Sequence, residues 1–192
     1  MSSDASASGA FVAVVGPSGS GKDSLIDFAR QRLAGRAEFT FVRRIVTRPA
    51  DRAAEDHDSL SEAHFEALAQ SNGLALHWQA HGLRYGLPRS IDSDIEAGRV
   101  VIANVSRQVI GEAAARYRRV IVANISARPE IIAQRLAARG REDAEAIRQR
   151  LARQLDVAVP GGESVEIDNS GPLQEAGEHF LGLLQQAQAE RV

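Results

Sequence analysis

Gly16-Pro17-Ser18-Gly19-Ser20-Gly21-Lys22 follows directly on the apolar run Phe11-Val12-Ala13-Val14-Val15, and a helical pattern of apolar residues continues from Lys22 to Ala34. A short β-branched strand, a glycine-rich turn and a helix are the setting of a phosphate-binding loop. The glycines let successive backbone N–H groups curl around an anion, and the amino end of the helix adds its positive dipole. Lys22 brings a full positive charge that can reach the outer phosphates of a nucleotide.

Asp23 departs from the usual pattern of such loops, in which a Ser or Thr follows the lysine and holds Mg²⁺ through its hydroxyl; Ser24 comes next. A carboxylate is a hard ligand that suits Mg²⁺, so one interpretation is that Asp23 replaces the hydroxyl, directly or through a metal-bound water. The other is that Asp23 is a first-turn acid favoured by the helix dipole. Both interpretations stay open, and residues Gly16 to Ser24 together are expected to bind ATP.

The composition indicates one ordinary globular domain: 192 residues, of which 44% are hydrophobic and 25% charged. A formal net charge of −2 argues against nucleic acid as the principal partner. The chain has no cysteine, which excludes disulfides and thiolate metal sites and suits a cytoplasmic protein. No apolar stretch is long enough to span a membrane, and residues 1–10 lack the features of a signal peptide. We expect a flexible tail over 1–10 and a single domain over 11–192.

Apolar runs that alternate with helical patterns predict an α/β fold, in which a central parallel sheet is flanked by helices. The expected strands are Phe11–Val15, Phe39–Val46, Val100–Asn104, Val120–Ile125 and Val165–Ile167. The expected helices are Lys22–Ala34, Glu62–Gln70, Ser90–Ala97, Arg107–Arg116, Pro129–Ala138, Glu142–Val157 and Pro172–Ala189.

The middle of the chain has a different pattern. Two short aromatic-bearing runs, Leu74–Ala80 and Leu83–Leu87, are broken at His81-Gly82 and predict a small antiparallel flap, inserted at about 43–90. An arginine-flanked loop from Arg139 to Asp143 predicts a mobile lid at about 137–147. A phosphate loop, a flap and a lid together describe a small-molecule kinase, whose lid excludes water and brings cations to the transferring group.

Three further stretches resemble the guanylate kinase branch of the P-loop kinases: Arg44–Pro49, Tyr85-Gly86, and Arg135–Gly140 with Ile147–Leu151. The resemblance implies that Arg44 and Arg48 contact an acceptor phosphate, for which guanidinium forks are suited; the alternative is that they are solvated charges. It likewise implies lid cations, against the alternative of the polar face of an amphipathic helix. These cations are Arg135, Arg139 and Arg150.

The base-reading positions of that branch are replaced. His77 precedes Trp78 where guanylate kinases have a Glu, Leu87 stands in place of a hydroxyl, and Asn104 and Ser106 stand where acids end a strand. His57 replaces a tyrosine that grips the acceptor phosphate. Loss of groups built to read a base lowers recognition of that base by orders of magnitude. The acceptor is therefore expected to be phosphorylated without being a guanine nucleotide.

The chain is similar to the ribose 1,5-bisphosphate phosphokinases of phosphonate degradation, which share Gly16 to Ser24 with the unusual Asp23, together with Ile45–Arg48, Leu76–Trp78 and Gly82–Gly86. The resemblance implies that ATP, with Mg²⁺, phosphorylates the 1-phosphate of ribose 1,5-bisphosphate to give 5-phosphoribosyl 1-diphosphate. It implies catalytic roles for Lys22, Arg135, Arg139 and Arg150. The acceptor-binding residues that it implies are Arg44, Arg48, His57, His77 and Tyr85, with the alternative that Tyr85 only anchors the flap.

Two other functions remain as alternatives. One is a guanylate or other nucleoside-monophosphate kinase. The other is a catalytically inactive guanylate-kinase-like binding module, which is less favoured because such modules generally lose the loop lysine and the lid cations, here Lys22, Arg139 and Arg150. The oligomeric state is left open.

Overall fold

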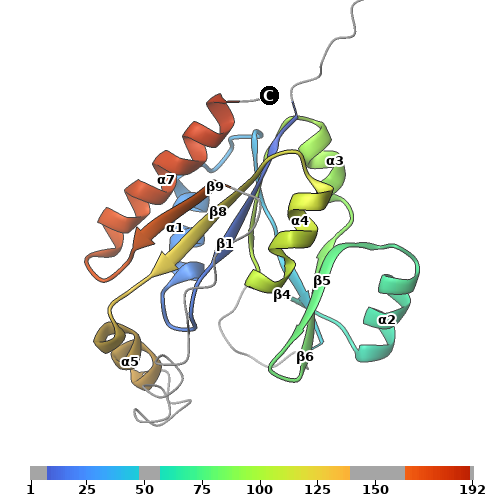
Figure 1. The fold of residues 1–192 in the computed structure, drawn as a ribbon, viewed down its shortest axis with the longest axis horizontal. Coiled ribbons are helices and arrows are strands. Elements are labelled where there is room, and N and C mark those ends of the chain that lie inside the picture. Colours follow the sequence, from blue (N-terminus) through green and yellow to red (C-terminus); the bar gives the residue numbers. More distant parts are fainter. Residues whose placement is uncertain (1–7, 48–56, 139–162, 191–192) are drawn as a thin grey trace, which may run out of the picture.

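The computed structural model describes residues 8–47, 57–138 and 163–190 and confirms the α/β fold (Figure 1). The central sheet has five parallel strands in the order β2-β7-β1-β8-β9. These strands are β1 (Ala10–Val15), β2 (Phe39–Phe41), β7 (Val100–Asn104), β8 (Val120–Ser126) and β9 (Glu163–Asp168). Every residue of β1 is buried, because helices and the inserted flap cover both faces of the sheet at this strand.

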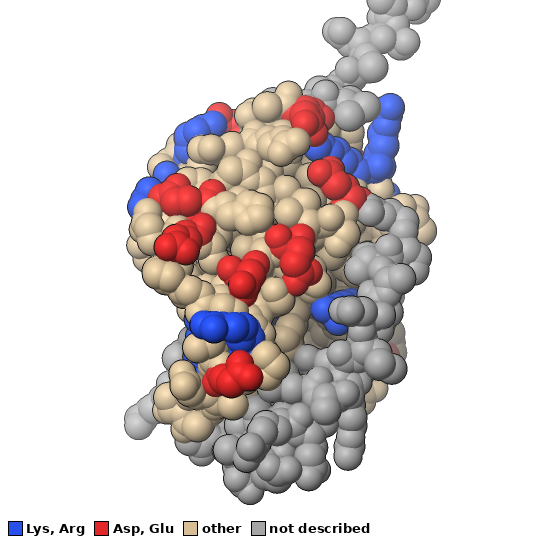
Figure 2. All heavy atoms as spheres, turned by 60° about the vertical axis from the view of Figure 1, so that its left-hand side comes forward, with Lys and Arg blue, Asp and Glu red and all other residues tan. Residues whose placement is uncertain are grey.

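Helices α1 (Lys22–Arg32) and α7 (Leu173–Ala189) cover one face of the sheet. They pack closely enough that a Cβ on Gly177 of α7 would lie 2.6 Å from the ring of Phe28 on α1. Arg32 bridges the same two helices through an ion pair with Glu178, on a face over which acidic side chains gather (Figure 2). The amphipathic pattern of the two segments predicts this packing.

The other face of the sheet is covered by α3 (Ile91–Glu96), the short 3₁₀ turn η1 (Arg107–Val109) and α4 (Ile110–Arg116). Helix α5 (Pro129–Ala138) follows β8 and carries its own small apolar cluster of Ile132 and Leu136. None of the helices in the described residues combines the length and apolar character needed to cross a membrane.

The predicted flap is confirmed as a second sheet of four strands in the order β4-β3-β6-β5, with α2 (Glu62–Gln70) against it (Figure 1). Its strands are β3 (Arg44–Val46), β4 (His57–Ser59), β5 (Leu74–Ala80) and β6 (Leu83–Pro88). Strands β5 and β6 form an antiparallel hairpin, and both turn residues, His81 and Gly82, have positive φ, as a tight primed turn requires.

Two expected boundaries were wrong. The expected strand Phe39–Val46 is two strands in different sheets: β2 pairs with β7 of the central sheet, whereas β3 pairs with β4 and β6 of the flap. The first strand begins at Ala10, and the backbone N–H of Gly9 donates to the carbonyl of Ile95 at 2.8 Å, so both residues belong to the packed domain rather than to the tail. The expected helix over 142–157 and the lid lie outside the described residues.

Candidate functional site

The glycine-rich loop joins β1 to α1 at the carboxyl end of the central sheet, where ligands bind in open α/β folds. Gly16 and Gly21 have φ of 145° and 90°, a region that side chains disfavour. A Cβ on Gly16 would lie 2.1 Å from the carbonyl oxygen of Ile125, and a Cβ on Gly21 would lie 2.3 Å from Nδ2 of Asn169. Both positions therefore demand glycine for conformation and for space.

The ammonium group of Lys22 folds back over this loop. Its Nζ donates hydrogen bonds to the carbonyl oxygens of Gly16 and Pro17, each at 2.8 Å. Lys22 is also the first residue of α1, so its charge and the positive end of the helix act at the same place. The structure thus brings together the cation and the backbone curl that phosphate binding requires.

Asp23 makes one contact that the sequence reasoning missed. Nδ2 of Asn104 donates to Oδ1 of Asp23 at 2.7 Å, across 81 residues of sequence. Asn104 is the last residue of β7, which pairs directly with β1, and its side chain is buried. Among the described residues, no hydrogen bond or ion pair involves the other carboxylate oxygen of Asp23. The signal available in the sequence was that Asp23 and Asn104 both depart from the usual pattern.

Arg135 and Asn169 fix the phosphate loop through hydrogen bonds to its backbone at Ser20. The carbonyl oxygen of Ser20 accepts hydrogen bonds from Nδ2 of Asn169 at 2.8 Å and from Nη1 of Arg135 at 3.3 Å. Nη2 of Arg135 donates to the carbonyl oxygen of Asn169 at 2.9 Å, which closes the triangle. The guanidinium of Arg135, expected to neutralise transferring charge, contacts the protein backbone at the loop. Sequence reasoning missed the tie from Asn169, which looks like an ordinary turn residue after the last strand.

The donor set suits Mg²⁺ better than a metal that needs a full protein cage. No cluster of three or more His, Asp or Glu side chains capable of holding a metal occurs within residues 8–47, 57–138 and 163–190. Mg²⁺ in nucleotide sites keeps several waters and takes one or two carboxylates together with phosphate oxygens. Asp23, at the amino end of α1 beside Lys22, supplies such a carboxylate with one oxygen uncommitted among these residues.

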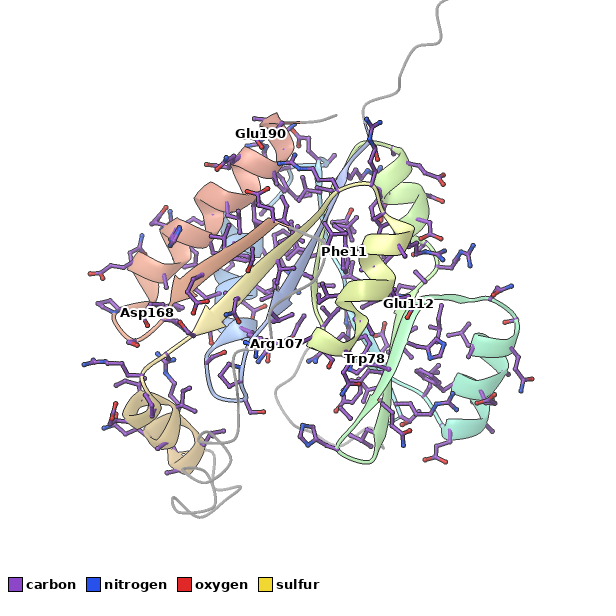
Figure 3. All side chains as sticks on the ribbon, viewed as in Figure 1. Phe11, Trp78, Arg107, Glu112, Asp168 and Glu190 are labelled. Atoms are coloured by element: carbon purple, nitrogen blue, oxygen red, sulfur yellow. The ribbon has the colours of Figure 1, made fainter. Side chains whose placement is uncertain are left out.

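On the flap, the structure brings Arg44 and Tyr85, two of the candidate acceptor-binding residues, close together. Tyr85 stacks on Trp78 with ring centroids 5.5 Å apart and planes inclined by 8°. The guanidinium carbon of Arg44 lies 5.8 Å from the centroid of Tyr85, within the range of a cation–π contact. Trp78 is buried where the flap meets η1 and α4 (Figure 3). His57 lies opposite Arg44 in the β3–β4 register.

His77 is not brought to this face. It lies opposite Gly86 in the β5–β6 register, one residue from the Trp78–Tyr85 pair, and successive side chains of a strand point to opposite faces. Its exposed side chain lies on the α2 side, near Glu66. Hydrogen bonds from Arg84, then from Gln70, lower the pKa of Glu66, and the charge of His77 contributes to the same shift. His77 therefore lies apart from Arg44 and Tyr85.

The remaining predicted residues divide into two groups. Pro17, Ser18, Gly19 and Ser24 lie on the loop or in the first turn of α1, as expected. Arg48, Arg139 and Arg150 lie outside the described residues, so their roles remain predictions. One further cation was missed: Arg107, at the start of η1, donates to Oδ1 of Asn124 at 2.7 Å at the carboxyl end of the sheet (Figure 3).

The curated relatives show the family of the chain, and a solved structure shows a similar fold. None of the protein-family models matches the chain. The chain is 54% identical over 173 residues to the ribose 1,5-bisphosphate phosphokinase PhnN of Brucella melitensis, covering 90% of each protein. It is 44% identical over 177 residues to the enzyme of the same name from Agrobacterium fabrum, covering 92% of this chain and 96% of the relative. In fold it is similar to the guanylate kinase of Anaplasma phagocytophilum, with a TM-score of 0.66, 16% identity, and coverage of 96% of this chain and 88% of that one.

Proposed function

The chain belongs to the ribose 1,5-bisphosphate phosphokinase family, and we propose that it transfers the γ-phosphoryl group of ATP to the 1-phosphate of ribose 1,5-bisphosphate. The product is 5-phosphoribosyl 1-diphosphate. We place this reaction in the cytoplasm, as a step of phosphonate breakdown. Guanylate kinase activity is the less favoured alternative, because the likeness to a guanylate kinase concerns the fold alone.

One observation carries the proposal: at three of the four replaced positions that guanylate kinases use to read guanine, the side chain is apolar, committed to another contact or turned away. Leu87 is fully buried in the core between the flap and the central sheet. Asn104 donates its amide to Asp23. His77 lies on the α2 side of the flap, away from Tyr85. The phosphate loop, with Lys22, is retained. A kinase fold that keeps its phosphate loop and lacks base-reading groups suits a sugar phosphate acceptor.

The chemistry that the protein must supply is positioning and charge neutralisation. An oxygen of the acceptor 1-phosphate is already ionised at neutral pH, so no general base is required. This oxygen bonds to the γ-phosphorus as the bond from that phosphorus to the bridging oxygen of ADP breaks. The backbone N–H groups of the loop and the ammonium of Lys22 bind the phosphates of ATP. Their positive charge stabilises the transition state more than the ground state, because negative charge shifts between the phosphates during transfer.

Mg²⁺ bound with ATP would supply further positive charge that offsets the charge of the phosphates. We assign its protein ligand to Asp23, whose carboxylate at the start of α1 has one oxygen held by Asn104. We assign the acceptor phosphates to Arg44 and Tyr85 on the flap, together with Arg48 of the Arg44–Pro49 motif and His57, which lies opposite Arg44 in the β3–β4 register. Arg139 and Arg150 are proposed as lid cations. Arg135 is proposed to act through the loop that it contacts.

The test compares acceptors in an assay of ADP release, with purified protein and with ribose 1,5-bisphosphate, GMP, dGMP and AMP. The sugar bisphosphate should exceed GMP in kcat/KM on the order of 10⁴-fold, the discrimination reached where the polar groups of a site pair with one substrate and are left unpaired by another. ATP hydrolysis without acceptor provides the baseline. Equal turnover of GMP and the sugar bisphosphate would identify the protein as an unusual guanylate kinase.

A further inference from the structure

We infer that Asn104 is a positioning residue that aims the carboxylate of Asp23 at the Mg²⁺ of bound ATP, and that the two side chains are a transposed form of the usual metal-binding pair. The inference rests on the proposed function, because it requires that the loop binds ATP with Mg²⁺. It assigns to Asn104 a role in metal binding rather than in recognition of the acceptor.

The usual pair in P-loop enzymes is a hydroxyl directly after the loop lysine and a carboxylate at the end of a strand. This chain has the reverse arrangement: the carboxylate of Asp23 follows Lys22, and the uncharged amide of Asn104 ends β7. One carboxylate is present in either arrangement. The site therefore keeps one negative charge to face the metal. The carboxylate that carries this charge is on the helix instead of on the strand.

The geometry explains why the amide accompanies the moved carboxylate. Asn104 is opposite Val14 in the β1–β7 register, so it lies beside the end of β1, just before the phosphate loop begins. At 7% exposure, its amide needs a hydrogen-bond partner, and Oδ1 of Asp23 accepts at 2.7 Å. This bond fixes the rotation of the carboxylate and commits one oxygen. A first-turn acid that served only the helix dipole would need no such anchor from a neighbouring strand.

The experiment measures the affinity for a non-hydrolysable β,γ-imido analogue of ATP by calorimetry, once with Mg²⁺ and once with EDTA, without any acceptor. Asp23→Asn should act with opposite signs in the two conditions. With EDTA the variant should bind the analogue more tightly than wild type, because a negative charge facing the phosphates is gone. With Mg²⁺ it should bind more weakly, because the metal has lost its carboxylate.

Asn104→Ala keeps the charge and removes the anchor. It should change the affinity measured in EDTA little, and should raise the Mg²⁺ concentration needed for tight binding by roughly 10- to 100-fold, as loss of a partner behind a metal ligand usually does. Asp27→Asn is the matched control: it removes the same charge one turn further along α1, where Asp27 is exposed and pairs with Arg30. Its ratio of affinities with and without Mg²⁺ should equal that of wild type.

The exchange variant Asp23→Asn/Asn104→Asp completes the test, because it restores one carboxylate and one amide in hydrogen-bond contact. It should recover most of the Mg²⁺ dependence lost in Asp23→Asn. Asn104→Asp alone puts two carboxylates in contact, so its melting temperature should fall in EDTA and recover with Mg²⁺. An unchanged Mg²⁺ dependence in either Asp23→Asn or Asn104→Ala, or a folded exchange variant without recovery, overturns the inference.

These readouts are independent of the acceptor. If the sugar bisphosphate fails as a substrate while the analogue still binds in an Mg²⁺-dependent manner through Asp23, the proposed function is wrong and the inference stands. If ribose 1,5-bisphosphate is phosphorylated while the variants bind Mg²⁺ and the analogue as wild type does, the function stands and the inference is wrong.

Discussion

Lys22 is the only lysine of the chain, among 23 lysine and arginine residues in total. Its Nζ bonds to the carbonyls of Gly16 and Pro17, a place that the larger guanidinium of arginine would not fill in the same way. Lys22→Ala should leave the fold intact and reduce kcat by at least about 10²-fold, because the ammonium matters most as charge shifts between phosphates. Steady-state kinetics together with a melting curve measure this.

The same residue can be tested without mutagenesis. An amine-directed reagent can modify only Lys22 and the N-terminal amine, and peptide mapping separates the two products. ATP should protect Lys22 and leave the N-terminal amine reactive. Near-wild-type turnover of folded Lys22→Ala, or equal labelling of Lys22 with and without ATP, would contradict the assignment of the phosphate loop.

Substitutions of Arg135 can distinguish a role in positioning the phosphate loop from a direct role in catalysis. Because its guanidinium spans the carbonyls of Ser20 and Asn169, Arg135→Ala should loosen the loop and lower the melting temperature. It should raise KM for ATP more than it lowers kcat. Arg135→Lys should not rescue the loss, since lysine lacks the two separate nitrogens, Nη1 and Nη2, with which the guanidinium reaches the two carbonyls.

The control for this change is Arg128→Ala, at an exposed arginine just before the same helix. This variant should retain wild-type KM and melting temperature. A reverse result for Arg135→Ala, in which kcat falls with KM for ATP and the melting temperature unchanged, would assign Arg135 to the transition state instead.

We expect substitutions in the flap to change the binding of the acceptor and to leave the binding of ATP unchanged. Arg44, whose guanidinium lies over the Tyr85–Trp78 stack, contributes a charge-assisted contact to the acceptor phosphate in the proposed function. Arg44→Ala should raise KM for ribose 1,5-bisphosphate by roughly 10- to 100-fold, since each charge-assisted hydrogen bond is worth about 1.5–3 kcal/mol. KM for ATP should change little.

Arg43→Ala is the matched comparison on the preceding residue. Arg43 lies just before β3 and forms an exposed ion pair with Asp58. It should bind both substrates as wild type does. If Arg43→Ala and Arg44→Ala weaken the acceptor equally, a general electrostatic field explains the effect and the contact at Arg44 does not.

At the scale of the whole molecule, a polar cluster around Asp92 that stabilises the fold lies apart from the phosphate loop. Asp92 of α3 accepts hydrogen bonds from Nε of Arg116 at 3.0 Å and from the hydroxyl of Tyr117 at 2.8 Å. Arg89 adds an ion pair at 2.6 Å. Because Arg116 ends α4 just before β8 begins, this cluster lies toward the amino ends of the strands, away from the phosphate loop.

Burial alone would raise the pKa of Asp92, but the hydrogen bonds from Arg116 and Tyr117 outweigh it and lower the pKa below the ordinary value. A depressed carboxyl pKa stabilises the folded protein fully above the pKa of the unfolded chain, and the contribution is lost as the pH falls through the folded value. Asp92→Asn should therefore cost about 1 kcal/mol at neutral pH and progressively less in acid. Urea unfolding from pH 7 to pH 3 measures this difference.

Catalysis should be unaffected by Asp92→Asn at neutral pH, because the cluster does not touch the site. A difference between wild type and variant that stays constant from pH 7 to pH 3 would show that the carboxylate charge is not what stabilises the cluster.

Local patterns were sufficient for much of the fold. The β1–loop–α1 unit follows from a buried apolar run, glycines at positive φ and helical spacing, all within 25 residues of one another. The hairpin of β5 and β6 follows from two strand patterns with His81-Gly82 between them. Such features are encoded by neighbours in the chain, so spacing and turn chemistry identify them.

Tertiary structure alone decided the contacts between distant segments. The division of Phe39–Val46 into β2 and β3 depends on which strands lie beside each half, and the polar strand β4 forms only because β3 offers it a partner. The bond between Asp23 and Asn104 exists because β7 lies next to β1 in the sheet. The sequence thus identified the residue types that are suited to bind phosphate, whereas strand order and packing across the sheet set the orientation of each side chain.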